Sequence, residues 1–600
     1  MSKDEHKLPL SKRKESIIFM MILFAFQVFM VVLFSVWVRY SKNEVNYSTL
    51  TPEQLQELEA TGGVVQEEVT NIYGYFRDIN IMIFFGFGFL MTFLRRYGYS
   101  ALGYTFIISA LVAQWSVLIY GFFETVDHKN DHGGDYASTF EMSQTVLLQG
   151  LFCAGAVMIS YGAVLGRVTP LQMLVVGIFE PIFYFLNMFI GEMNLEAIDV
   201  GGGMYIHLFG SVFGLTIAWF LTDKKSKDCE DNSPSYTGDY FAMAGTLFLW
   251  MMWPSFNAAI APLGEPQFRA IANTFLSLTA STIATFIVTR LFGHLGHKID
   301  MVHVQNSSLA GGVVQGCLAH MNINPGGAIG MGFLAGVISV IGYLFISPFL
   351  QRRFNIQDTC GIHNLHFMPG FIGSIAACIA AWKGLNDRSL YNPIEFNQIF
   401  RAGEDQARNN AAATFISIGI AIAGGLFVGM ILKALKKVGG LKAKQYYQDS
   451  AFWHVPIDYP KDVEYVVEQN NLPMPTTDNG DNVVGGGVEM KKHNNNNNKK
   501  ENGYRRDLIR LLETLVRNEQ STDSSYSDSD SSDEEEKERR IRKLAKKSYR
   551  RSKKSHSEHQ PQHQPEESTF NNNNNNNNNN ATAETTDNGG SSTNSPTSKV

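Results

Sequence analysis

Cysteine is scarce in this chain, with only five among 600 residues. The five are Cys153, Cys229, Cys317, Cys360 and Cys378, and none falls in a segment that the hydropathy pattern places outside a membrane. Proteins that depend on disulfide bonds carry paired cysteines in an oxidising compartment. A disulfide framework is therefore excluded as the basis of this fold.

Charge is absent from Ser16–Val38, a run that reads SIIFMMILFAFQVFMVVLFSVWV. The run exceeds the roughly 20 residues that cross a bilayer as a helix. It also exceeds the ~7–15 apolar residues of a signal peptide, and no small-residue cleavage site follows it. We expect it to remain as a first membrane span, 16–38, behind a cytoplasmic N-terminus of residues 1–15.

The motifs of common enzyme classes are also missing. The chain has no glycine-rich phosphate loop and no nucleophile elbow. Two histidine pairs, HNLH (His363 and His366) and HLGH (His294 and His297), have a spacing that could bind a metal. No cysteine-rich or carboxylate-rich set accompanies either pair. A metalloenzyme is thus the weaker alternative, and we expect no catalysis, metal, cofactor or nucleic-acid partner.

What the chain has in abundance is long apolar runs. The mean hydropathy of −0.08 hides this, because it averages an apolar part up to about residue 435 with a polar remainder. Eleven further runs have membrane-spanning length: 78–94, 99–123, 145–166, 170–191, 202–222, 240–262, 268–292, 303–321, 326–350, 360–382 and 411–435. The pattern predicts an all-α polytopic membrane protein of about twelve spans.

The basic residues predict the orientation of these spans. With the N-terminus in the cytoplasm, the loops on that side hold Arg95, Arg96, Arg167, Lys224, Lys225, Lys227, Lys298, Arg352 and Arg353. The long external segments also hold some basic residues, such as Lys383 and Arg388, but long loops weigh little in orientation. The external loops near 192–201 and 322–325 contain no Lys or Arg, as the positive-inside rule requires. An even number of spans returns the C-terminus to the cytoplasm. Asn46, in an Asn-Tyr-Ser sequence of the first external loop, is a glycosylation candidate.

The last part of the chain, 436–600, has a different composition. It contains two asparagine runs, an acidic block near 521–536 and a basic block near 537–554. Low hydrophobicity and blocks of like charge favour disorder. We expect a disordered cytoplasmic tail that is available to cytoplasmic partners.

A short pattern occurs twice within the apolar part. The segments Asp199–His207 (DVGGGMYIH) and Asp358–His366 (DTCGIHNLH) share Asp first, Gly fourth and His ninth. Asp199 stands at the outer end of a span that runs inward, and Asp358 at the inner end of a span that runs outward. Opposite orientation indicates an inverted-topology repeat, with halves at 78–222 and 240–382 and with 16–38 and 411–435 as peripheral spans.

Each histidine lies eight residues past its aspartate, which is about 12 Å along a helix. The two therefore approach the middle of a hydrocarbon layer roughly 30 Å thick from opposite sides. Ionisable groups at this depth are functional candidates; the structural alternative is that each histidine satisfies a hydrogen bond between packed helices. Asp199 and Asp358 suit helix N-termini, where a carboxylate meets the positive end of the dipole.

Several longer stretches allow a comparison with a known family. MYIHLFGSVFGL, GTLFLWMMWPSFNAA, DMVHVQNSSLAGGV and DTCGIHNLHFMPGFIG resemble the Rh glycoprotein branch of the ammonium transporter (Amt/Mep/Rh) superfamily. GFGFLMTFLRRYGYSALGYTF and YGAVLGRVTPLQ extend the resemblance, which covers about 15–435. The resemblance implies a homotrimer in which each protomer conducts ammonia derived from ammonium, and it leaves carbon dioxide open as a second permeant.

The resemblance also implies roles for individual residues. His207 and His366 correspond to a pair of pore histidines, and Phe152 and Phe256 to a stacked pair that gates the outer entry. Asp199 corresponds to a pore-entry aspartate, for which helix capping is the other reading. Two positions depart from the family: Met188 stands where an acidic vestibule residue is common, and His363 where asparagine is common.

The chemistry of such a pore follows from general principles. Burial of an isolated ammonium ion costs many kcal/mol, whereas neutral ammonia can exchange hydrogen bonds with neutral imidazoles, each of which has one donor and one acceptor. Two alternatives remain: a proton-coupled carrier of a small amine, and a membrane scaffold without transport. The host membrane is expected to be the plasma membrane or that of an intracellular vesicle or vacuole.

Overall fold

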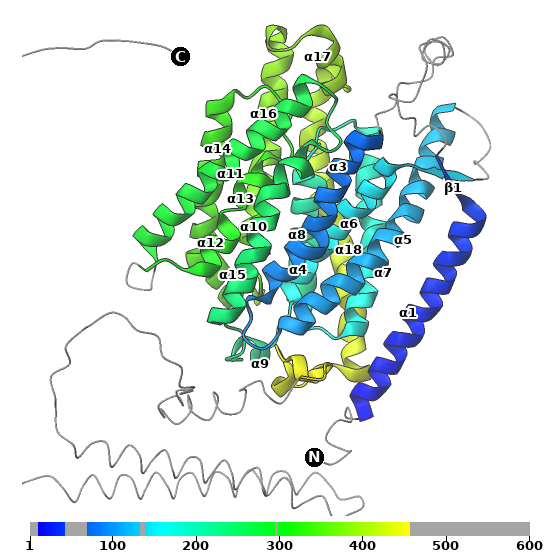
Figure 1. The fold of residues 1–600 in the computed structure, drawn as a ribbon, viewed down its shortest axis with the longest axis vertical. Coiled ribbons are helices and arrows are strands. Elements are labelled where there is room, and N and C mark those ends of the chain that lie inside the picture. Colours follow the sequence, from blue (N-terminus) through cyan, green and yellow to red (C-terminus); the bar gives the residue numbers. More distant parts are fainter. Residues whose placement is uncertain (1–9, 42–68, 133–138, 294–297, 456–600) are drawn as a thin grey trace, which may run out of the picture. The chain divides into compact units, whose positions relative to one another are not determined.

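The computed structural model describes residues 10–41, 69–132, 139–293 and 298–455 (Figure 1). Within these ranges, ten helices are long and apolar enough to cross a membrane. Two of the twelve expected spans fall outside this set. The run 240–262 lies on a less apolar helix, α10 (Tyr236–Ala258), and 303–321 is broken into α12 (Met301–Ser307) and α13 (Ala310–Gln315).

The N-terminal half of the bundle contains six of the ten long spans. Its elements are α1 (Leu10–Trp37), α3 (Val69–Asn80), η2 (Ile81–Gly86), α4 (Phe87–Leu90), η3 (Met91–Phe93), α5 (Gly98–His132), α6 (Gln144–Val164), α7 (Pro170–Met188), η4 (Phe189–Asn194), η5 (Gly203–Leu208) and α8 (Phe209–Leu221).

The C-terminal half follows a short inner connection. Beyond α10, α12 and α13, its elements are α9 (Lys224–Lys227), α11 (Glu265–Phe292), α14 (Pro325–Ile341), η6 (Gly342–Ile346), α15 (Ser347–Phe354), η7 (His363–Phe367), α16 (Met368–Asn386), η8 (Arg388–Leu390), α17 (Pro393–Ile399), η9 (Gly403–Asp405), α18 (Gln406–Gly439), η10 (Ala443–Gln445) and η11 (Asp449–Ala451).

The described part also contains one small sheet, which the all-α expectation missed. Strands β1 (Val38–Tyr40) and β2 (Phe140–Met142) pair in parallel, with Val38 opposite Phe140. Runs of three residues are too short to give a strand signal in a sequence. Below, the end of the bundle where α1 begins is called the inner end, and the end with α17 the outer end (Figure 1).

Helix α1 begins earlier than the expected boundary at residue 16. Its first turns hold two charged side chains that are each only 1 % exposed. Lys12 Nζ donates to Gly439 O (2.6 Å), and Glu15 Oε1 accepts from Leu171 N (3.0 Å). These contacts satisfy free backbone groups at the end of α18 and the start of α7, so residues 10–15 are part of the bundle.

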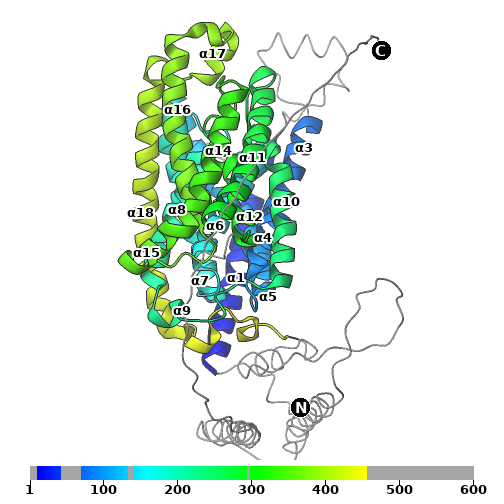
Figure 2. The ribbon, with the colours of Figure 1, turned by 90° about the vertical axis from the view of Figure 1, so that its left-hand side faces the viewer.

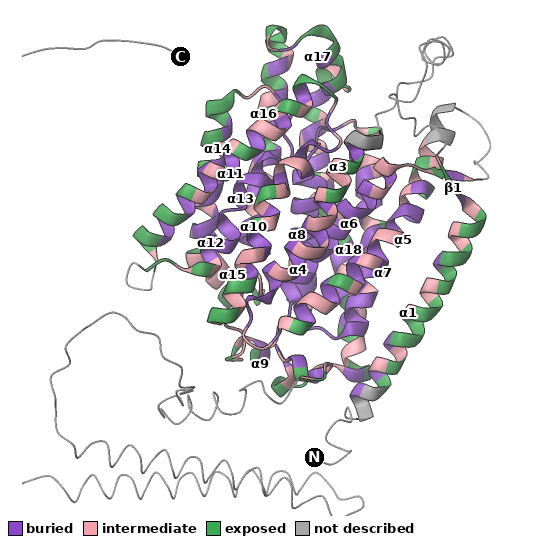
Figure 3. Ribbon diagram, viewed as in Figure 1, coloured by how far each residue is buried: buried purple, intermediate pink, exposed green. Residues whose placement is uncertain are grey.

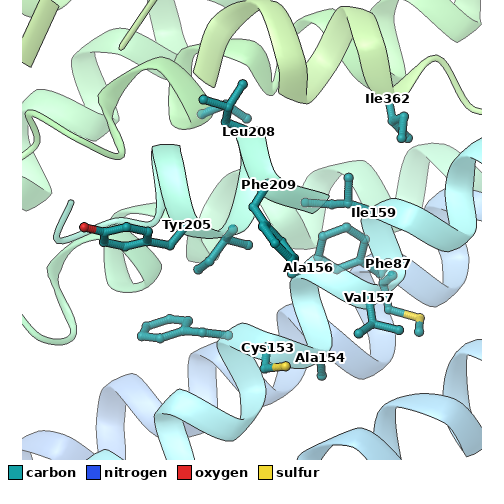
Figure 4. Packing of buried hydrophobic residues seen from close by; sticks show 14 of the residues in the cluster. Phe87, Cys153, Ala154, Ala156, Val157, Ile159, Tyr205, Leu208, Phe209 and Ile362 are labelled. Carbon is teal, nitrogen blue, oxygen red and sulfur yellow. The ribbon is translucent and has the colours of Figure 1, made fainter. Parts of the chain in front are cut away.

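The core lies around α6, whose side chains are almost all buried (Figure 3). Figure 4 shows Ala156 and Ile159 of α6 beside the ring of Phe209, the first residue of α8. Close approach depends on glycine here: a Cβ at Gly214 would lie 2.6 Å from Ser160 Cα. The repeat partner Gly373, on α16, meets Val314 of α13 in the same way.

Residues 440–455 are folded, which corrects the expectation that disorder begins at 436. Helix α18 continues to Gly439, and the segment beyond it crosses the inner end of the bundle. Tyr447 N donates to Gly166 O (2.9 Å), and Gln357 Nε2 donates to Tyr447 Oη (2.8 Å). The remainder of the expected tail, 456–600, lies outside the described residues.

Candidate functional site

His207 and His366 lie in contact at the centre of the bundle. Their Nδ1 atoms are 3.2 Å apart, and the rings stack with centroids 5.2 Å apart at an angle of 15°. The exposed fractions are 1 % and 3 %. One Nδ1 must donate and the other accept, so a single hydrogen is shared between two neutral rings.

Phe152 and Phe256 lie on one side of this pair. Their ring centroids are 4.9 Å apart, at an interplanar angle of 70°. The rings therefore meet edge to face, and the stacked arrangement that the resemblance implied is wrong for this chain. Edge-to-face contact is a favoured geometry because the positive edge of one ring meets the negative face of the other. Phe256 also lies 5.9 Å from the ring of His207.

Trp253 is a site residue that the sequence analysis did not single out. Its ring stacks on His207 (5.5 Å, 30°), and its exposed fraction is 1 %. Both Trp253 Nε1 and His207 Nε2 are buried without a hydrogen-bond partner in the described part of the chain. The only available signal was its place three residues before Phe256, one helical turn along the same motif.

The helix that carries His207 begins at a tight turn. Gly202 has φ +67°, a left-handed conformation that glycine adopts readily. The following turn, η5, is a π-helix, a form often found at functional sites. Asp199 Oδ2 accepts from both Met204 N (2.9 Å) and Tyr205 N (2.7 Å).

The helix that carries His366 is built in the same way. Gly361 has φ +76°, and η7 is again a π-helix. Asp358 uses both oxygens: Oδ1 accepts from Gly361 N (2.9 Å) and Ile362 N (3.0 Å), and Oδ2 from His363 N (2.9 Å).

Both aspartates act as helix caps in the structure. Burial raises the pKa of Asp199 to about 7, although the N–H groups of Tyr205 and Met204 and the Cys317 thiol oppose the shift. Burial likewise raises the pKa of Asp358, against the N–H donors of the turn. Burial thus makes the neutral form of the Asp199 carboxyl easier to populate than in a free aspartate.

A small cavity lies beside the histidine pair. It has a volume of about 20 Å³ and is lined by His366, Ile362, Leu365, Ile159, Met158 and Phe87, among others. A site needs roughly 10–15 Å³ on this measure to hold one water molecule. The cavity therefore fits a single molecule of the size of water or ammonia.

The two positions that depart from the family are buried. Met188 is 4 % exposed. Glu192, one turn later on the same helical segment, supplies a partly buried carboxylate at this outer end, and the sequence comparison overlooked it because it tested only the aligned position. His363 stacks on Phe367 (5.1 Å, 18°) and bonds Asn364 Oδ1 (3.2 Å), in contrast to His366, which contacts His207.

The two candidate metal motifs differ in what can be said of them. His294 and His297, like the glycosylation candidate Asn46, lie outside the described residues. His363 and His366 have different partners. Across the described ranges, no group of three or more His, Cys, Asp or Glu side chains is arranged to hold a metal ion.

The fold and site define a multi-pass helical membrane protein with a histidine pair buried in its centre. The model of the Ammonium Transporter Family matches residues 54–450. The chain belongs to this family, and the expected resemblance to its Rh branch is confirmed by its relatives. The chain is 72 % identical to Rhesus-like glycoprotein A of Dictyostelium discoideum over 468 residues. This match covers 78 % of the chain and 88 % of the relative.

Other relatives agree with this assignment. Ammonium transporter Rh type B of Danio rerio is 44 % identical over 64 % of this chain and 83 % of its own length. The solved structure of Nitrosomonas europaea Rh50 is similar with a TM-score of 0.55 and 30 % identity, and covers 67 % of this chain and 97 % of that one. Saccharomyces cerevisiae Mep2 (TM-score 0.50, 18 % identity, 64 % and 92 % covered) shares the fold.

Proposed function

We propose that this protein is an Rh-type channel that conducts ammonia along the path Phe152–Phe256, His207, His366. The observation that carries the proposal is the buried 3.2 Å contact between the two histidine rings. The Rh relatives support the substrate, since their names identify ammonium transporters and a conduction study. Ionisable residues such as these histidines are costly to bury at the centre of a membrane bundle, so they are functional candidates by default.

The arrangement separates ammonia from cations. An ammonium ion can interact with the faces of Phe152 and Phe256 but cannot pass them as a charge, because an isolated buried charge costs many kcal/mol. It therefore gives its proton to water at the outer side and continues as ammonia. Ammonia exchanges hydrogen bonds with the imidazoles and fits the cavity beside His366. Potassium has no proton to lose and is excluded.

The same proposal covers assembly and location. The family resemblance supports a homotrimer, in the plasma membrane or that of an intracellular vesicle or vacuole. The Lys and Arg residues at the inner end, such as Lys224 and Arg352, support a cytoplasmic orientation for both termini. We propose transport without catalysis, and carbon dioxide as a second permeant to be tested with the same vesicles.

The test is stopped-flow measurement of internal pH in vesicles that contain the full-length protein and receive an ammonium gradient. We expect fast alkalinisation with the wild type, and the rate of empty vesicles with the His207→Ala, His366→Ala double variant. His363→Asn is the matched control, since His363 faces Phe367, and should conduct as the wild type does. Wild-type flux in the double variant would contradict the proposed path.

A further inference from the structure

Six basic side chains gather at one corner of the inner end. Lys224 and Lys225 begin α9, Arg352 and Arg353 end α15, and Lys433 and Lys437 lie near the end of α18; all six are exposed. We call this set the basic corner. Figure 2 shows α9, α15 and the lower end of α18 on the same side of the bundle.

Hydrogen bonds hold the three elements of the basic corner together. Lys436 Nζ donates to Leu221 O (3.1 Å), which joins α18 to the end of α8. Asn355 Nδ2, just past α15, donates to Thr222 O (3.2 Å). Lys227 Nζ on α9 donates to Asn355 Oδ1 (2.8 Å). The three elements that carry the six side chains are thus held together at this end of the bundle.

Ion pairs do not neutralise the charges of the basic corner within the described part of the chain. None of the six cations forms an ion pair there; Lys433 lies over the Phe220 ring and Arg353 over the Phe354 ring. The nearest carboxylate, Asp223, already accepts from Tyr446 Oη (2.7 Å) and pairs with Lys436 (3.6 Å). Asp228, the residue directly after α9, is exposed but forms no ion pair with any of the six cations.

Exposed apolar side chains on α8 and α18 lie next to the cations of the basic corner. Trp219 on α8 is 50 % exposed and packs edge to face on Phe220 (5.2 Å), the ring under Lys433. Met430, one turn before Lys433, is 57 % exposed. Tryptophan prefers the headgroup level of a bilayer, and lysine extends its charge from apolar surface toward that level.

We propose that the basic corner binds the headgroups of anionic phospholipids in the leaflet at the inner end. Clusters of four to eight Lys or Arg directly beside a membrane helix attract such lipids, and the exposed Trp219 and Met430 would contact their acyl chains. An anionic lipid accounts for both the charges and the exposed apolar side chains, whereas the acidic composition of 521–536 could account only for the charges. The proposal concerns the lipid and does not depend on the permeant.

The experiment uses full-length protein in phosphatidylcholine nanodiscs that contain a minor fraction of dansyl-phosphatidylserine. Energy transfer from tryptophan to dansyl reports lipid near the protein, and dansyl-phosphatidylcholine gives the neutral reference. A lysine near the surface contributes about fivefold to affinity, so Lys433→Gln, Lys437→Gln should weaken enrichment about 30-fold. Lys298→Gln, Lys383→Gln, which removes two exposed charges elsewhere, should not change it.

Three results would overturn the proposal. The first is equal enrichment in Lys433→Gln, Lys437→Gln and the wild type, with both unfolding at the same temperature. The second is displacement by inorganic phosphate at matched ionic strength, which would identify a site for free phosphate. The third is enrichment that arises only after the acids of 521–536 are neutralised, which would show that the tail occupies the basic corner.

Discussion

At the scale of single residues, the two aspartates of the repeat differ in how they cap. Asp199 uses one oxygen for two N–H donors, whereas Asp358 uses both oxygens for three. A carboxamide has only one acceptor oxygen. The two positions therefore respond differently to the same substitution, although the sequence makes them equivalent.

We expect Asp199→Asn to retain stability and ammonia flux, because its pKa of about 7 already makes the neutral carboxyl common. Asp358→Asn should lower the free energy of unfolding by about 1–3 kcal/mol, because its NH2 group would face the His363 N–H. Thermal unfolding measures the stability and vesicle flux measures the transport. Asp199→Ala and Asp358→Ala give the loss expected when the cap is removed entirely. Equal losses in the two Asn variants would contradict this account.

Gly312 tests the role of Trp253. A Cβ at Gly312 would lie 2.5 Å from the Trp253 ring, which is buried and cannot swing aside. We expect Gly312→Ala to displace the ring that stacks on His207 and to lower ammonia flux by about tenfold or more, since small misplacements at a site are costly. Gly330→Ala, with nothing within 4 Å of its Cβ, is the control. Unchanged flux in Gly312→Ala would mean that Trp253 does not position His207.

At the scale of elements, the two histidine helices are built alike and packed alike. Each begins with a left-handed glycine and a π-helical turn, and each approaches a neighbouring helix through a glycine seven residues past its histidine. The neighbours are α6 for α8 and α13 for α16. This correspondence supports the inverted repeat at the level of backbone geometry.

Both close contacts should fail when a methyl group is added. We expect Gly214→Ala and Gly373→Ala each to destabilise the protein by about 1–3 kcal/mol, because the added Cβ meets backbone atoms that cannot move away. Gly419→Ala on α18 has open space around its Cβ and should be neutral or slightly stabilising, since glycine weakens helices. Thermal unfolding in detergent compares the three. Unchanged unfolding temperatures in both Gly214→Ala and Gly373→Ala would contradict the close packing of these helices.

At the scale of the whole molecule, the segment 440–455 ties distant parts together. Asp449 accepts from Tyr99 N (3.0 Å) and Ser100 N (2.8 Å), the first free donors of α5. Helix α5 thus obtains its N-terminal cap from a residue some 350 positions later in the chain. The same segment contacts Gln357, next to Asp358.

We expect Asp449→Ala to lower the free energy of unfolding by about 0.5–2 kcal/mol, the usual cost of a lost cap. Asp449→Asn should also lose stability, because it keeps one acceptor oxygen but turns its NH2 group toward the second N–H donor. Ser450→Ala, an exposed neighbour, is the control. A midpoint unchanged by Asp449→Ala would show that the contact contributes nothing to stability.

The sequence by itself determined the helical membrane fold and gave four candidate residues of the site. Apolar runs of bilayer length and the repeated Asp-to-His spacing are local properties, so they can be recognised in the sequence alone. His207, His366, Phe152 and Phe256 were all named from motifs, and the structure places each pair in contact.

Only the tertiary structure decided how these residues meet. The edge-to-face rings, the stack of Trp253 on His207 and the cap that Asp449 gives to α5 each join elements distant in the chain. The folded segment 440–455 also depends on tertiary contacts. Its composition predicted disorder, and its partners at the inner end are distant in the sequence. Contacts of this kind depend on packing between helices, which composition and periodicity do not encode.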